Sequence, residues 1–123
     1  MITLENIRSI VRDRYVDIVT DILEPTPYKL RLVLTDNSFI DVHISHKVKN
    51  SFSFHWERRF IDNTIYRYDN FPDVNFKHLR TFPYHLHYGK EHKALPITFH
   101  KRLPKAFVDF MEFVKVVLKK EKD

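Results

Sequence analysis

Apolar and polar residues alternate along five runs in the first 69 residues, and this pattern predicts five consecutive β-strands. Successive strand residues point to opposite faces of a sheet, so an apolar residue at every second position marks a buried face. In the first strand we expect Val16 and Ile18 on one face and the carboxylates of Asp17 and Asp21 in solvent on the other. The predicted strands span residues 15–23, 28–34, 40–44, 51–60 and 64–69.

Two further segments show helical rather than strand periodicity. Residues 3–13 place apolar side chains at helical spacing after Thr3, whose hydroxyl suits the N-cap position. A longer helix is expected from Pro104 onward, because proline is favoured in the first turn and a continuous apolar stripe follows. That stripe is wider than one sheet face requires, which predicts a leftover apolar surface for a partner.

The segment between the last strand and this helix, residues 70–102, holds three prolines and shows little periodicity. We expect it to form an ordered loop that folds back over the sheet, with one short strand or turn near 82–88. Together the elements predict an α+β fold: an antiparallel five-stranded β-meander with a short N-terminal helix and a long C-terminal helix packed on the sheet.

Length and composition narrow the classes of function. A chain of 123 residues fits a single domain, 1–123, with one modest core. The single glycine excludes Gly-rich phosphate loops, and the absence of cysteine excludes disulfides, cysteine-ligated zinc and thiol nucleophiles. Because the chain shows neither a signal-peptide pattern nor an apolar run of about 20 residues, we expect a cytoplasmic protein without membrane contact.

Positive charge is concentrated in the middle of the chain. The net charge is +5, yet residues 43–105 hold twelve Lys and Arg against five Asp and Glu. This segment is also rich in aromatic residues and histidine. Basic side chains bind phosphates and flat rings stack on bases, so the combination favours a single-stranded nucleic acid as the partner.

Residues 53–87 collect more titratable side chains than a hydrophobic core needs, which indicates a site. Metal-free RNA cleavage requires a base, an acid and a cation for the phosphate, and histidine and arginine suit these roles. Asp69 would orient a histidine or hold the arginine. The candidate catalytic residues are His55, Arg67, Asp69, His85 and His87, with no cofactor. The candidate nucleic-acid-binding residues are Tyr66, Tyr68, Lys77, His78, Arg80 and Tyr84.

Strand register decides whether these residues meet. If Trp56 and Tyr68 share one face, then His55, Arg67 and Asp69 gather on the other, together with Glu57. A slip of one residue would exchange the faces.

Two alternatives stay open. The pair His85 and His87, with Asp69 or His78, has the spacing of a metal site on a strand, which would make the protein a metal-dependent hydrolase. In a non-catalytic module that binds nucleic acid or protein, Arg67 and Asp69 would instead form a salt bridge that pins a hairpin. The histidines would then bond loop backbone.

The same stretch resembles the TumE-type family of small toxins from prokaryotic toxin–antitoxin operons. The matching motifs are His55-Trp56, Arg67-Tyr68-Asp69-Asn70, Lys77-His78 and Thr81-Phe82-Pro83-Tyr84-His85-Leu86-His87. The family often has two adjacent histidines after the Phe-Pro pair, and here Tyr84 takes the first place. The resemblance implies a toxin with a cognate antitoxin, and many toxins of such operons attack RNA. We expect the antitoxin to cover the apolar face of the last helix and an exposed sheet edge, and we leave a homodimer open.

Overall fold

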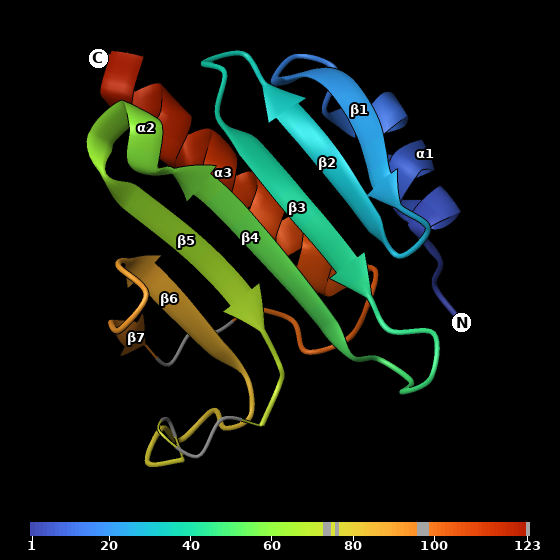
Figure 1. The fold of residues 1–123 in the computed structure, drawn as a ribbon, viewed down its shortest axis with the longest axis vertical. Coiled ribbons are helices and arrows are strands. Elements are labelled where there is room, and N and C mark those ends of the chain that lie inside the picture. The colour runs from blue at the N-terminus through green and yellow to red at the C-terminus, as the bar shows by residue number, and fades with distance from the viewer. Residues whose placement is uncertain (73–74, 76, 96–98, 123) are drawn as a thin grey trace.

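The computed structural model describes residues 1–72, 75, 77–95 and 99–122. Its seven strands form one antiparallel sheet whose strand order follows the chain (Figure 1). The elements are α1 (Leu4–Arg14), β1 (Val19–Thr26), β2 (Lys29–Leu34), β3 (Phe39–Ile44), β4 (Phe52–Arg58), α2 (Arg59–Asp62), β5 (Thr64–Asp69), β6 (His85–Gly89), β7 (Ala94–Leu95) and α3 (Lys105–Lys122). The prediction of an α+β meander with two flanking helices is confirmed.

The predicted number of five strands is wrong, because the segment expected to be a loop with one short strand or turn near 82–88 adds two strands to the sheet, β6 and β7. β6 pairs with β5 from Ile65 opposite Gly89 to Asp69 opposite His85, and β7 pairs with β6. The segment therefore extends the sheet at its edge. Alternation is hidden in β6 because His85, Leu86 and His87 are all buried, so polar residues stand where an apolar face would reveal the strand.

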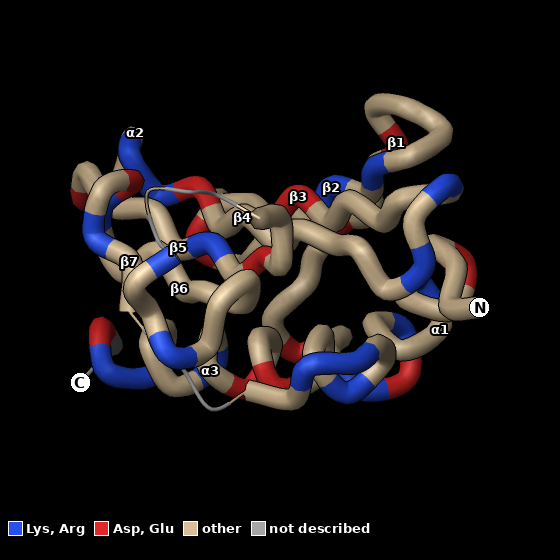
Figure 2. The backbone as a smooth tube through the Cα atoms, turned by 90° about the horizontal axis from the view of Figure 1, so that it is seen from below, with Lys and Arg blue, Asp and Glu red and all other residues tan. Residues whose placement is uncertain are grey.

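Both long helices lie on the same side of the sheet (Figure 2). We call the other side the open face. Buried residues of β2 to β6 meet α1 and α3 in one core that contains Leu32, Val42, Phe54, Trp56, Tyr68, Phe107, Phe110 and Val114. α1 begins as predicted, with Thr3 and Asn6 forming a reciprocal capping box. Among the described residues no helix has both the length and the apolarity that a membrane span requires.

The first strand begins four residues later than predicted. Residues 15–18 form a turn in which the amides of Ile18 and Val19 donate to the carbonyl oxygen of Tyr15. Val16 is 71% exposed while Val19 is buried, so the predicted faces are wrong there. The register of β1 against β2 also shifts between Val19 and Asp21, so β1 has one extra residue there, as in a β-bulge. This extra residue interrupts the alternation from which the strand faces were predicted.

The fourth strand ends at Arg58 rather than at residue 60. A single helical turn, α2, follows it and ends at Asn63, which has a φ of 64° in the left-handed region that asparagine tolerates. Part of the apolar surface that was predicted to be left over on the last helix is covered within the chain, since Phe113 packs against Tyr66, Tyr88 and Phe99.

Candidate functional site on the open face

Strand register brings the predicted catalytic residues onto one face. Trp56 pairs with Tyr66 on the helix-covered side, which leaves the alternate residues of β4 and β5 on the open face. His55 lies opposite Arg67, and Arg67 lies opposite His87. Neighbouring strands are about 4.8 Å apart, so these three residues form a row roughly 10 Å long at the backbone.

The end of the row at His87 is buried, together with the neighbouring residues Asp69 and His85. Asp69, His85 and His87 are only 3%, 2% and 2% exposed. His85 Nε2 lies 3.2 Å from Asp69 Oδ1, and His87 Nε2 lies 3.9 Å from Asp69 Oδ2. The two imidazole rings meet edge to face with their centroids 4.8 Å apart. The carboxylate is therefore enclosed by two histidines that belong to the neighbouring strand.

Arg67 joins this buried end to the surface. Its Nε lies 3.1 Å from Asp69 Oδ2, and its Nη2 lies 3.2 Å from His87 Nε2. On the outer side its Nη1 donates to Glu91 Oε1 at 2.9 Å. A quarter of the Arg67 side chain stays exposed, so the guanidinium is held in place and still reaches solvent.

His55 and Glu57 form the less buried end of the row, with side chains that are 19% and 14% exposed. His55 Nε2 lies 3.2 Å from Glu57 Oε1, and no other hydrogen bond involves the His55 ring among the described residues. The carboxylate is strongly stabilised in its charged form: hydrogen bonds from Arg59, and to a lesser extent from His55, lower the pKa of Glu57 to about 2. A carboxylate bonded to one ring nitrogen leaves the other nitrogen of His55 able to accept a proton.

Hydrogen bonds also set the protonation of His87. A backbone carbonyl only accepts, so His87 Nδ1, which lies 2.6 Å from the carbonyl oxygen of Glu91, carries the proton. His87 Nε2 then accepts from Arg67. Burial is the largest cause that lowers the pKa of His87, and Arg67 and His85 add to it, so the neutral ring is favoured. His85 Nδ1 likewise donates to the carbonyl oxygen of Pro83 at 2.8 Å.

The residues predicted to bind nucleic acid do not lie together. Tyr66 and Tyr68 belong to the helix-covered face, where Tyr68 is fully buried and donates to the carbonyl oxygen of His100. Rings in the core offer no stacking surface to bases. Tyr84 is half-buried against the core and bonds Asn50 through its hydroxyl. Exposed positions are held by Lys77, His78 and Arg80, all in the turn before β6.

One feature of the site was missed from the sequence, and a second was predicted only in part. Glu91 was not foreseen because it lies in the β6–β7 turn, within the segment expected to be a loop. The second feature is a set of exposed cations around β6 and β7, which we call the basic loops (residues 77–80, 90–93 and 101–105). Residues 77–105 contain seven Lys and Arg, all exposed, and one acid, Glu91. The charge count over residues 43–105 predicted this concentration of positive charge, and Lys77 and Arg80 were among the candidate residues, but the five cations between residues 90 and 105 were not singled out.

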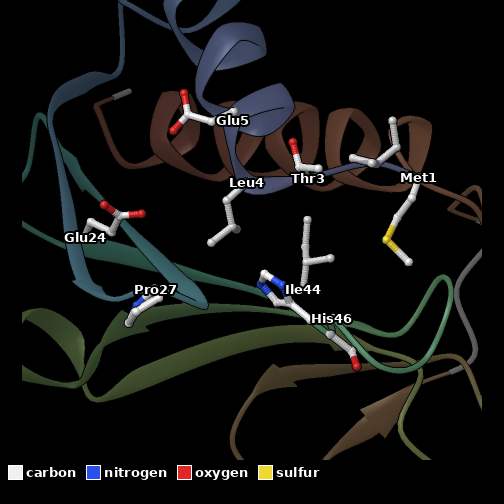
Figure 3. Close-up of a pocket in the computed structure, with 10 residues that line it drawn as sticks. Met1, Thr3, Leu4, Glu5, Glu24, Pro27, Ile44 and His46 are labelled. Atoms are coloured by element: carbon white, nitrogen blue, oxygen red, sulfur yellow. The ribbon is translucent and has the colours of Figure 1, made fainter.

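A hollow near the N-terminus lies apart from this site. It opens between the start of α1, the end of β1 and the end of β3, and Glu5, Glu24 and His46 are among its lining residues (Figure 3). None of the predicted catalytic or nucleic-acid-binding residues lines this hollow. The titratable row on β4 to β6 is therefore the better candidate for function.

Comparison with known proteins gives one match. A family model described as Toxin TumE matches residues 4–117, nearly the whole chain. Neither a curated protein nor a solved structure matches it significantly.

Proposed function

The chain belongs to the TumE family of toxins, and from that premise we propose that it is a toxin that cleaves RNA without a metal ion, at the row formed by His55, Arg67 and His87. The observation that carries the proposal is the register. It sets a cation between two histidines on three neighbouring strands, and the accessible histidine is oriented by a carboxylate.

RNA binding is supported by the distribution of charge. The open face itself is largely neutralised, because Arg31 pairs with Asp41 and Arg59 pairs with Glu57. The Lys and Arg residues of the basic loops, in contrast, form no ion pair among the described residues, and two of the three loops flank the strand that carries His85 and His87. We expect RNA phosphates to contact the basic loops, which places the backbone across the row.

Arg67 is the phosphate-binding residue in this proposal. Its outer bond goes to Glu91, a carboxylate that is about half exposed and presents an anion where a phosphate oxygen would bind. An incoming phosphodiester would replace Glu91 on the guanidinium, which forms two parallel hydrogen bonds with phosphate oxygens. Asp69 and His87 hold the guanidinium from beneath and act as positioning residues.

His55 supplies the base. Its accessible ring nitrogen takes the proton of the 2′-hydroxyl, and the 2′-oxygen bonds to phosphorus. The bond from phosphorus to the 5′-oxygen then breaks, the 5′-oxygen takes a proton from water, and a 2′,3′-cyclic phosphate is left. The proton held by His55 neutralises the hydroxide that this step forms. Glu57 favours the charged ring during the reaction, and Arg67 stabilises the charge that develops on phosphorus.

A non-catalytic nucleic-acid-binding module is the second candidate, and it has an observation of its own. Arg67 is bonded to Asp69, His87 and Glu91, as in a salt bridge that pins a hairpin. Three of the five predicted catalytic residues are buried and touch no solvent-borne substrate in this conformation. Salt-sensitive RNA binding without turnover would favour this candidate.

The toxin family implies a cognate antitoxin. We propose that it covers the exposed apolar residues Val16 and Val116, beside the shallow apolar hollow that Ile18 and Leu118 help to line. Val116→Asp should then reduce co-purification with the antitoxin, whereas Val48→Asp, at a similarly exposed valine in the β3–β4 loop, should not. Equal capture by both variants would place the antitoxin elsewhere.

Incubation of the purified chain with total RNA, with and without EDTA, tests the nuclease. We expect cleavage that EDTA leaves unchanged and that His55→Ala reduces by about 10² to 10⁴, the range for loss of a general base. Arg67→Ala should reduce cleavage by about 10² or more. His46→Ala and Arg12→Ala, exposed residues far from the row, are the matched controls. Undetectable cleavage by the folded wild-type chain would contradict the nuclease and leave the binding module.

A further inference from the structure

Asp69, His85 and His87 form a compact set of donor atoms on two neighbouring strands. Asp69 pairs directly with His85 across β5 and β6, and His87 follows two residues later on the same face. One donor atom from each residue lies within 4.8 Å of the other two. All three residues are buried, so bulk water competes little for these atoms.

The two imidazole rings are held in the orientation that metal-ligating histidines adopt. Each Nδ1 donates to a backbone carbonyl oxygen, that of Pro83 for His85 and that of Glu91 for His87. These bonds fix the tautomer and turn each Nε2 toward the carboxylate of Asp69. In a histidine that binds a metal through one ring nitrogen, the other ring nitrogen usually donates to a carboxylate, a backbone carbonyl or water.

Two of the distances within this set are close to those of a tetrahedral site. Bonds of about 2.0–2.2 Å to nitrogen and oxygen place neighbouring ligands roughly 3.3–3.6 Å apart. The separations between Asp69 oxygens and the two Nε2 atoms are 3.2 Å and 3.9 Å. Small rotations of the three side chains would therefore bring them to bonding distance of one ion.

The guanidinium of Arg67 contacts the same atoms. It lies 3.1 Å from an oxygen of Asp69 and 3.2 Å from Nε2 of His87, so a metal cation and this guanidinium exclude each other. Arg67 has room to leave, because a quarter of its side chain is exposed and Glu91 holds its outer nitrogen. Outward rotation of one side chain would open the site.

We propose that Asp69, His85 and His87 bind a divalent transition-metal ion, Zn²⁺ above all, in exchange for the Arg67 guanidinium. Two imidazoles and one carboxylate suit Zn²⁺ and its neighbours, whereas Mg²⁺ prefers oxygen ligands alone. Bound metal would release Arg67 toward solvent. The inference does not rest on the proposed cleavage of RNA, because binding is measured in its absence.

Calorimetric titration of the EDTA-treated full chain with Zn²⁺ tests the proposal, with Mg²⁺ as the comparison ion. We expect one Zn²⁺ per chain, no heat from Mg²⁺, and a rise in the Tm of the wild type with Zn²⁺. Arg67→Met keeps the length of the side chain and removes its charge. It should strengthen Zn²⁺ binding at least about tenfold, because the ion no longer has to displace the guanidinium from Asp69 and His87.

Loss of a ligand is the second arm. His85→Ala and Asp69→Asn should abolish the titration, and His78→Ala, an exposed histidine in the turn before β6, should leave it unchanged. Circular dichroism checks that each variant is folded, and the wild-type Tm shift needs no variant at all. The proposal is overturned if the wild type binds no Zn²⁺, if folded His85→Ala binds as well as the wild type, or if Arg67→Met gains no affinity.

Discussion

Two networks of charged side chains are built into this sheet, one around Arg58 and one around Asp69. Arg58 lies at the end of β4 on the helix-covered side and is 1% exposed. It bonds carboxylates of Asp36, Asp62 and Glu121, and its guanidinium lies over the Trp56 ring at 4.7 Å. Asp69 is equally buried on the open face, but its neighbours are two histidines and one arginine.

The two networks differ in whether the charges of their side chains can change. Burial alone would lower the pKa of Arg58, but the three carboxylates outweigh burial and raise it, so this cation is permanent. Its partners come from the β2–β3 turn, α2 and the end of α3, which makes the network a clamp between elements. The network around Asp69 joins only neighbouring strands, and two of its members are histidines, a residue type that can be either neutral or charged. A fixed charge suits stability, and a variable one suits chemistry.

Replacement of Arg58 should give the largest loss of stability. Arg58→Met removes the cation and leaves three carboxylates close together, so we expect the free energy of unfolding to fall by about 3 kcal/mol, the low end for breaking a buried ion pair. Urea denaturation measures this loss. A fall of less than about 1 kcal/mol would show that solvent already screens the partly exposed carboxylates.

Asp69→Asn should instead have a small effect on stability and a large effect on RNA cleavage. Its oxygen can still accept from the amide of Phe71, so we expect a loss of only about 1–2 kcal/mol in the free energy of unfolding. RNA cleavage should fall by about 10², because Arg67 loses its charged anchor and shifts. The control is Asp41→Asn, which removes the carboxylate paired with Arg31 on the same face. Equal losses of cleavage in both variants would remove Asp69 from the site.

Much of the fold follows from local pattern. β2 to β5 and both long helices were predicted because Leu30, Leu32 and their counterparts repeat with clean periodicity. The open-face grouping of His55 and Arg67 depended on register, which the sequence left conditional. Only the pairing of Trp56 with Tyr66 resolves it.

The remaining differences come from non-local pairing. β6 is buried on both faces and carries histidines, so neither alternation nor hydrophobicity marks it as a strand. Tyr66 and Tyr68 were assigned to stacking, yet the same alternation that puts Arg67 on the open face turns both rings into the core. Glu91 reaches Arg67 only because β6 and β7 form a hairpin, a contact across 24 residues that no local motif encodes.

The dependence of stability on acidic pH should reveal the contribution of Glu57, which lies at the His55 end of the row. Hydrogen bonds from Arg59 lower the pKa of Glu57 from 4.5 to about 2, so the folded chain binds this proton less readily than the unfolded chain. Glu57 thus contributes stability above about pH 4.5, and the contribution disappears as the pH falls toward 2. We expect wild type to exceed Glu57→Gln by about 0.5–1 kcal/mol at pH 6, and the two to converge near pH 2.

Urea denaturation at several pH values measures this difference. Glu24→Gln, an exposed glutamate in β1 without an ion pair among the described residues, controls for the change in overall charge. If the gap between wild type and Glu57→Gln stays constant from pH 6 to pH 2, the carboxylate does not act through its charge.

The smallest expected effects come from one glutamate in each network, and these two residues allow the most direct comparison. Glu91 and Glu121 are matched: their side chains are 47% and 42% exposed, and each bonds a better-buried arginine from outside. Glu91→Gln and Glu121→Gln should each change the free energy of unfolding by less than about 1 kcal/mol, because exposed partners contribute little. Only Glu91→Gln should alter RNA binding, strengthening it about two- to threefold at low salt by freeing the outer side of Arg67 from a competing anion. Fluorescence anisotropy with a labelled single-stranded RNA measures this. Equal gains in both variants would reflect net charge alone, whereas a gain confined to Glu91→Gln would mark Arg67, and not Arg58, as the arginine that meets the phosphate.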